Sequence, residues 1–224
     1  MPADAQQFTL AVDATHRVSA LLIEPPRAFA CYVLAHGAGA GMRHASMEAV
    51  ARELADRSVA TLRYQFPYME QGAKRPDPPA LCHATVHAAV AKAAELKLPL
   101  IAGGRSFGGR MTSQAQAKAP LHGVRGLAFL GFPLHPAGKP SDERAAHLSE
   151  VQIPMLFLQG TRDALASLSL LQPLVKRLGQ RATLTLIQDA DHSFHVPAKT
   201  GRNDADVRGE MLDALAGWAR EVVA

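Results

Sequence analysis

The chain has 224 residues and a mass of 23.9 kDa, and its 48% hydrophobic and 20% charged residues suit one globular domain and exclude a disordered or fibrous chain. The formal charge of +4 suggests nucleic-acid binding, but the 24 basic residues are scattered and aromatic residues make up only 5%, so no such surface is predicted. No apolar stretch approaches the roughly 20 residues of a membrane span, and residues 1–7 lack the basic and apolar regions of a signal peptide.

The first half of the chain alternates short apolar runs with segments of helical period. It begins with two neighbouring strand-like runs that are joined by a turn at residues 25–27. A helix, a strand, a loop rich in proline and charge, a second helix and a short apolar strand follow. In chain order these predicted segments are residues 18–24, 28–35, 42–58, 59–66, 67–79, 80–96 and 98–103.

The second half repeats the alternation, and Gly179 is placed to end one of its helices. Strands that are apolar on both faces and alternate with helices predict an α/β fold, with helices on both faces of a mostly parallel central sheet. No repeat or linker divides the chain, so we expect a single domain over residues 1–224. The predicted segments are a helix at 107–119, strands at 126–132 and 151–159, a helix at 165–178, a strand at 183–187 and a helix at 204–223.

The strongest local signal lies between the strand at 98–103 and the next helix, where Gly-x-Ser-x-Gly is centred on Ser106. A nucleophilic serine at a sharp strand-to-helix turn has strained backbone dihedrals, so its neighbours on both sides must be small. The following helix also points the positive end of its dipole at the serine. The pattern therefore predicts Ser106 as a nucleophile.

A nucleophilic serine needs a base and an acid that orients it, and both are expected at the ends of later strands. Asp163 follows the strand at 151–159 in a tight turn, and His192 follows the strand at 183–187. The order Ser106, Asp163, His192 is the order of nucleophile, acid and base in the α/β-hydrolase fold. We therefore predict these three residues as a catalytic triad.

Other residues compete for the roles of base and acid. His195 lies three residues beyond His192 and farther from the strand end. Asp189 and Asp191 are candidate acids, but sequence neighbours of a histidine rarely reach its far nitrogen. Asp142 follows the preceding strand only after a long loop.

An oxyanion hole is also required, because the tetrahedral intermediate carries negative charge on the former carbonyl oxygen. The backbone N–H of Phe107 is expected to supply one donor. The second is expected from Ala38 in the loop at residues 36–41, whose glycines allow the amides to turn inward. This loop lacks the Lys-Ser/Thr ending of a P-loop, which argues against phosphate binding.

Together these residues resemble the α/β-hydrolase superfamily, and more closely its small cap-less branch related to dienelactone hydrolases. The nearest likeness is to predicted serine hydrolases that include testis-expressed and chromatin-complex proteins of animals. The resemblance places Ser106, Asp163 and His192 at the triad positions and Ala38 and Phe107 at the oxyanion positions. Dienelactone hydrolase itself carries a cysteine nucleophile, so its lactone substrate is not implied. The resembling stretches cover about residues 30–200 and begin at His36, Leu62, Gly103, Gly131, Gln159 and Ala190.

The connection at residues 133–150 is too short for the helical cap that many hydrolases insert there, so we expect no cap domain. The loops at 67–79 and 133–140 would then wall the site. Tyr68, Met69 and Phe132 are candidates to line an acyl pocket, or else they pack on the sheet. Arg105 and Arg110 flank the elbow, where they would favour acidic acyl groups or pair with nearby carboxylates.

The two cysteines, Cys31 and Cys82, define neither a disulfide framework nor a metal site, so a cytoplasmic protein is expected. The sequence thus predicts a serine hydrolase that cleaves small carboxylic esters or thioesters through a covalent acyl-enzyme. We expect it to act as a monomer or homodimer on a small-molecule ester, with no metal, organic cofactor, nucleic acid or membrane. A serine peptidase and a non-catalytic scaffold on the same fold remain alternatives, and an intact triad argues against the scaffold.

Overall fold

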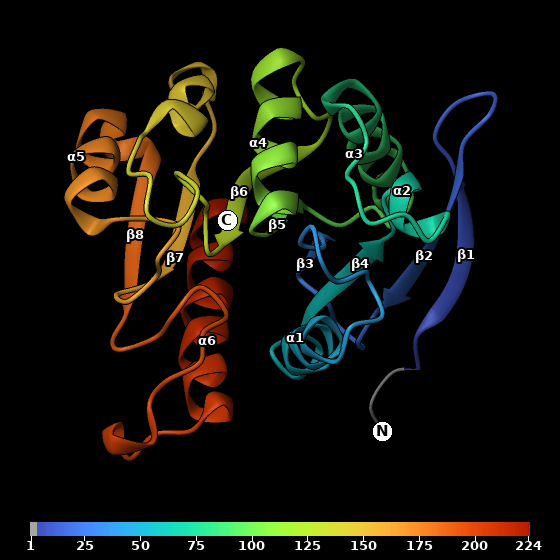
Figure 1. The fold of residues 1–224 in the computed structure, drawn as a ribbon. Helices are drawn as coiled ribbons and strands as arrows, with labels where there is room; N and C mark the ends of the chain where they lie inside the picture. Colours follow the sequence, from blue (N-terminus) through green and yellow to red (C-terminus); the bar gives the residue numbers. More distant parts are fainter. Residues whose placement is uncertain (1–3) are drawn as a thin grey trace.

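The computed structural model describes residues 4–224, so the first three residues of the predicted domain lie outside the described residues. Within the described residues, eight strands form one sheet in the order β1-β2-β4-β3-β5-β6-β7-β8 (Figure 1). The pairs β1–β2 and β2–β4 are antiparallel, and every other pair is parallel. The strands are β1 (Gln6–Ala11), β2 (Arg17–Ile23), β3 (Ala30–Ala35), β4 (Val59–Tyr64), β5 (Leu100–Arg105), β6 (Val124–Leu130), β7 (Met155–Gly160) and β8 (Ala182–Ile187).

Helices cover both faces of this sheet (Figure 1). One face packs against α3 (Pro79–Ala94), α4 (Phe107–Lys118) and α5 (Leu168–Leu178). The other face packs against α1 (Ala45–Asp56) and α6 (Asp204–Val223). The predicted α/β architecture with a mostly parallel sheet is therefore confirmed.

The central strands are apolar on both sides because both sides are covered. All six residues of β3 are buried. Val33 packs in the cluster under α3 and α4, and its neighbour Leu34 packs in the cluster under α1 and α6. This alternation explains why the run at residues 28–35 is continuously hydrophobic rather than alternating with polar residues.

Several elements differ from the sequence expectations. Strand β1 was not expected, and the predicted loop at residues 67–79 begins with the short helix α2 (Pro67–Glu70). Residues 151–154 precede β7 instead of belonging to it, consistent with Pro154, which has no N–H for a sheet. Strands β2 and β3 are successive in the chain but not in the sheet, because β4 lies between them.

In the described residues, 4–224, no cap domain covers the carboxyl ends of the strands. The connection from β6 to β7 contains only a 3₁₀ helix, η1 (Glu143–Glu150). This matches the expectation drawn from the length of the connection. Among residues 4–224, no helix has the length and apolar character to cross a membrane.

Candidate active site

Ser106 lies at the sharp turn between β5 and α4, with φ 50° and ψ −116°. These positive-φ dihedrals are strained for a residue other than glycine, as expected for a nucleophile elbow. A Cβ atom on Gly108 would lie 2.5 Å from the carbonyl oxygen of His36, and one on Gly104 would lie 2.3 Å from that of Ala35. The two glycines are therefore needed because β3 packs directly against the turn.

The structure brings Ser106, His192 and Asp163 together in one hydrogen-bonded chain. Nε2 of His192 lies 2.8 Å from Oγ of Ser106, and its Nδ1 lies 2.6 Å from Oδ2 of Asp163. The Asp163 side chain is fully buried, so its carboxylate requires Nδ1 of His192 to carry the proton. Nε2 is then free to accept the proton of the Ser106 hydroxyl.

Two further polar contacts, which the sequence did not predict, hold the Asp163 carboxylate. The buried Gln159, at the end of β7, donates from Nε2 to Oδ2 of Asp163 and accepts at Oε1 from the Phe132 N–H at 2.9 Å. The N–H of Leu165 donates to Oδ1 of Asp163 at 2.7 Å. Gln159 therefore ties the end of β6 to the acid. Its one sequence signal is an amide side chain inside an apolar strand.

The alternative residues have other partners. His195 is exposed, and its Nδ1 contacts Oδ1 of Asp204 at 2.8 Å, which raises the pKa of His195. Asp142 pairs with Arg177 at 2.8 Å. These contacts leave His192 as the histidine that faces Ser106.

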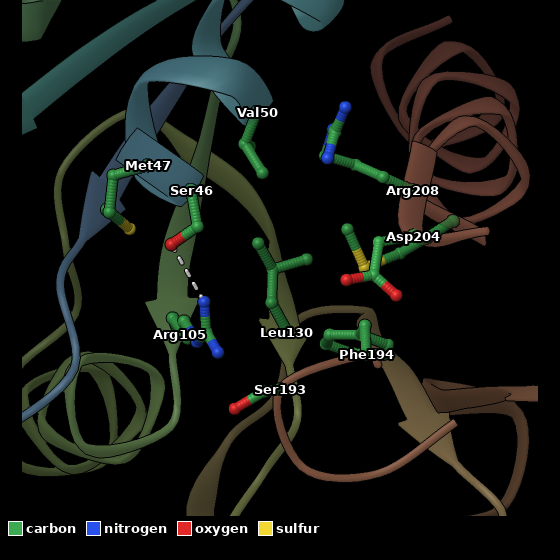
Figure 2. Close-up of a pocket in the computed structure, with 10 residues that line it drawn as sticks. Ser46, Met47, Val50, Arg105, Leu130, Ser193, Phe194, Asp204 and Arg208 are labelled. Atoms are coloured by element: carbon green, nitrogen blue, oxygen red, sulfur yellow. Dashed lines mark hydrogen bonds between the residues drawn. The ribbon is translucent and has the colours of Figure 1, made fainter. Parts of the chain in front are cut away.

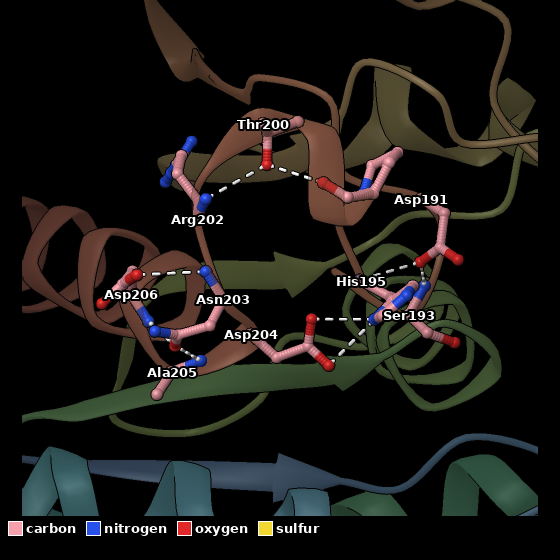
Figure 3. A network of polar contacts seen from close by, with 10 residues as sticks. Asp191, Ser193, His195, Thr200, Arg202, Asn203, Asp204, Ala205 and Asp206 are labelled. Carbon is pink, nitrogen blue, oxygen red and sulfur yellow. Dashed lines mark hydrogen bonds and ion pairs between the residues drawn. The ribbon is translucent and has the colours of Figure 1, made fainter.

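The remaining candidate acids belong to the loop that carries His192. Asp191 accepts through Oδ1 from the N–H groups of Ser193 at 2.7 Å and His195 at 3.0 Å (Figure 3). The N–H of Asp189 donates to the Thr161 hydroxyl, and Asp189 has a positive φ of 60°. Both aspartates therefore shape the turn around His192.

The loop after β3 lines the same cavity as Ser106. Ala38, together with Gly37 and Gly39, lines the cavity that contains Ser106 and His192. Phe107 is the first residue of α4, where backbone N–H groups have no partner inside the helix. The N–H groups of Ala38 and Phe107 donate to no acceptor within residues 4–224. They are therefore available to a ligand oxygen.

Tyr68 was expected as a candidate acyl-pocket residue, but it supports the loop of Ala38 instead. Its side chain is buried, with 2% of the residue exposed, and its hydroxyl donates to the carbonyl oxygen of Ala38 at 2.9 Å. Burial raises the pKa of the phenol, so the hydroxyl stays protonated and remains a donor. The sequence predicted that Tyr68 lies near the site, but it did not predict the direction of its side chain.

His36 fixes the start of the same loop. Its Nδ1 contacts the carbonyl oxygen of Gly37 at 2.7 Å, and its Nε2 accepts from the N–H of Phe66 at 3.0 Å. An imidazole that accepts at Nε2 must be neutral. Burial lowers the pKa of His36 to about 4, which agrees with the neutral form.

The other predicted substrate residues separate into two groups. Phe132 is fully buried and packs edge-on against Phe129 at a ring distance of 5.1 Å, which agrees with the alternative that it packs on the sheet. Met69 packs against the same hydrophobic core. Arg110 lies over the Phe107 ring at 5.9 Å. Arg105, in contrast, lines the cavity beside Ser106.

This cavity has a volume of about 380 Å³ and opens to solvent between the Ala38 loop, α1 and the His192 loop. Its wall includes residues 37–40, Met47 and Leu165. In the part of the chain that the structure describes, no group of three His, Cys, Asp or Glu side chains is arranged to hold a metal ion. The arrangement suits a serine nucleophile acting on a small, accessible carbonyl compound.

We expect Tyr68→Phe to lower kcat about three- to tenfold with little change in KM, because the Ala38 loop loses a support. Tyr32→Phe is the matched control, since the buried Tyr32 hydroxyl also donates to a backbone carbonyl, that of Ala128 at 2.8 Å. Each variant should lose about 1 kcal/mol of stability, the usual worth of one hydrogen bond. Ester hydrolysis and urea unfolding of both variants test this, and equal kcat values would contradict the role of Tyr68.

Protein stability should fall as the pH decreases from about 6.5, the pKa of an unperturbed histidine, to about 4. Burial lowers the pKa values of His36 and His147 to about 4, so the unfolded chain takes up protons in this range that the folded chain does not. Each histidine contributes a slope of at most about 1.4 kcal/mol per pH unit, and His147 less because it is partly exposed.

Urea unfolding at several pH values measures this slope. His147→Gln can keep the hydrogen bond to the Ser113 hydroxyl but removes the titrating group, so its slope should be shallower. His122→Gln, at an exposed position, is the matched control and should keep the wild-type slope. An unchanged slope in His147→Gln would contradict the assignment.

A family model described as an alpha/beta hydrolase domain matches residues 28–220. The chain is similar to an α/β serine hydrolase without lid from Xanthomonas campestris, with 21% identity, a TM-score of 0.74, and coverage of 97% of this chain and 96% of that chain. It is also similar to a dienelactone hydrolase from Anabaena variabilis, with 20% identity, a TM-score of 0.75, and coverage of 99% and 97%.

A third similar structure is the esterase domain of a Rhodothermus marinus protein, with 17% identity, a TM-score of 0.73, and coverage of 99% of this chain and 100% of that chain. At these identities the likeness shows the fold. Together with the family match, it confirms the α/β-hydrolase fold without a cap that the sequence motifs predicted.

Proposed function

Because the chain belongs to the alpha/beta hydrolase domain family, we propose that it is a single-domain serine hydrolase that cleaves small carboxylic esters or thioesters. The observation that carries the proposal is the hydrogen-bonded chain from Ser106 through His192 to the buried Asp163, open to a cavity at one end. The similar structures named as an esterase and a dienelactone hydrolase favour an ester bond.

In the first half of the reaction, the Ser106 oxygen attacks the carbonyl carbon while its proton moves to Nε2 of His192. The carbonyl oxygen becomes an oxyanion that accepts hydrogen bonds from the N–H groups of Ala38 and Phe107. The tetrahedral intermediate then collapses. The bond to the alcohol or thiol breaks, that group leaves with the proton from His192, and an acyl-enzyme on Ser106 remains.

In the second half, a water molecule replaces the leaving group. His192 takes a proton from the water, whose oxygen attacks the acyl carbon, and then returns the proton to Ser106 as the carboxylic acid leaves. Asp163 stays ionised and holds the ring of His192 in the tautomer with Nδ1 protonated. Gln159 and the Leu165 N–H keep the carboxylate in place.

The proposal is tested by labelling the purified native protein with a fluorophosphonate probe, which phosphonylates only activated serines. We expect one adduct per chain, and peptide mapping should place it on the tryptic peptide that contains Ser106. Protein denatured in urea is the control and should not react, because the activation depends on the hydrogen bond to His192. A native, folded protein that takes up no probe would favour the scaffold function instead.

A further inference from the structure

A second, smaller cavity adjoins the one that contains Ser106. It has a volume of about 120 Å³ and lies between α1, α6 and the loop that follows His192 (Figure 2). We call it the side pocket. The two cavities share the lining residues Ser46, Met47, Arg105 and Ser193, so the side pocket borders the cavity that contains Ser106. Most of the remaining wall is apolar and is formed by Val50, Leu130, Phe194 and Met211.

The guanidinium of Arg105 stands at the junction of the two cavities. Arg105 immediately precedes Ser106 in the chain and is half-buried. Figure 2 shows the Arg105 side chain beside Ser46, across the side pocket from Asp204 and Arg208. Nη1 of Arg105 donates to the Ser46 hydroxyl at 2.9 Å, and this is the only hydrogen bond that the guanidinium makes to residues 4–224.

Among residues 4–224, the positive charge of Arg105 has no counterion within hydrogen-bond distance. Arg208, which also lines the side pocket, pairs with Glu53 at 2.6 Å, and Asp204 pairs with His195. Within the described chain Arg105 forms no such pair with a carboxylate. Arg105 is half-buried, and burial lowers its pKa while the negative charge of Asp191 acts in the opposite direction from beyond ion-pair distance. A partly desolvated cation with unused N–H donors is stabilised by a bound anion.

We propose that Arg105 and Ser46 form an anion subsite, and that the substrates are short esters or thioesters that carry a free carboxylate. The planar guanidinium matches a carboxylate with two parallel hydrogen bonds. The spacer between the ester and the carboxylate is short, because Arg105 and Ser106 are adjacent and the side pocket is small. This inference rests on the proposed function, and it adds a substrate class to the site.

The test compares kcat/KM for matched esters by pH-stat titration. In the first pair, monomethyl glutarate carries the carboxylate on the acyl side of the ester, and methyl pentanoate is its uncharged counterpart. In the second pair, 2-acetoxyacetate carries the carboxylate on the alcohol side, and ethyl acetate is its uncharged counterpart. For each pair the measured quantity is the ratio of charged to uncharged kcat/KM, which removes general effects on the chemistry. The substrate pair whose ratio changes more when Arg105 is substituted identifies the side of the ester that faces the subsite.

In one of the two pairs, Arg105→Gln should lower this ratio at least about tenfold, as expected for a lost charge-assisted hydrogen bond. Arg105→Lys keeps the charge and should restore part of the ratio. Arg52→Gln is the matched control, because Arg52 is an exposed arginine on α1 that pairs with Glu48 outside both cavities. It should leave both ratios unchanged. Equal ratios in wild type and Arg105→Gln would overturn the subsite but not the hydrolase function.

A second measurement does not depend on turnover. Glutarate should raise the Tm of the wild type and of Arg52→Gln, and should raise the Tm of Arg105→Gln much less. If the wild type hydrolyses no ester but glutarate still stabilises it through Arg105, the subsite stands and the proposed function fails. If glutarate shifts neither wild type nor variant, the subsite is refuted.

Discussion

Ser106→Ala should lower kcat for 4-nitrophenyl butyrate by about four orders of magnitude or more, because loss of the nucleophile removes the covalent path. The fold should survive, since alanine removes a single oxygen atom and keeps the Cβ that the strained turn already holds. Circular dichroism and urea unfolding check the fold, and stopped assays at high enzyme concentration measure the residual rate.

Ser113→Ala is the matched control for this variant. Ser113 lies on α4, the helix that Ser106 precedes, and its hydroxyl contacts the carbonyl oxygen of Arg110 and Nε2 of His147. This variant should keep most of the rate. If Ser106→Ala retains more than about a tenth of wild-type activity, Ser106 is not the nucleophile.

The second large effect is expected for His192→Gln, with a loss of about three or more orders of magnitude in kcat. Glutamine can keep a hydrogen bond to Ser106 but cannot accept and return a proton at neutral pH. The same substitution at His195 is the matched control, because both histidines place Nδ1 within 2.8 Å of a carboxylate, yet only His192 contacts Ser106. His195→Gln should change the rate less than about threefold.

Initial rates at saturating and at low substrate concentration separate kcat from KM for both histidine variants. The opposite ranking, with His195→Gln inactive and His192→Gln active, would assign the base to His195. Similar large losses in both variants, with unchanged stability, would show that the geometry of the whole loop at residues 191–195 governs the rate.

The parts of this structure that the sequence predicted are those that leave a recognisable pattern in a short stretch of sequence. The central strands are recognisable because burial on both faces makes them continuously apolar, as in β3. Ser106 is recognisable because its strained turn needs glycine at fixed spacings. Asp163 and His192 could be placed because parallel strands bring their carboxyl ends to one edge of the sheet. The roles of all three as a triad stay predictions until the substitutions above are measured.

The features that were missed depend on contacts between distant segments. In β1, Phe8 and Leu10 face the core at alternate positions, but the other residues are exposed and the run is short, so pairing with β2 decides that it is a strand. Gln159 looks like an ordinary polar residue until Asp163 is brought beside it, and the hydrogen bond from Tyr68 to Ala38 joins two segments that are distant in the chain. Sequence position alone did not show that Phe132 points into the core.

The close approach of Gly108 to the carbonyl oxygen of His36 has a consequence for protein engineering. The two candidate oxyanion donors belong to different segments, Ala38 after β3 and Phe107 at the start of α4, and contact at Gly108 sets the distance between those segments. A side chain at position 108 would therefore push the donors apart even where the protein still folds. A mutant library built to change substrate range should keep position 108 as glycine and vary the side-pocket residues Val50 and Met211 instead.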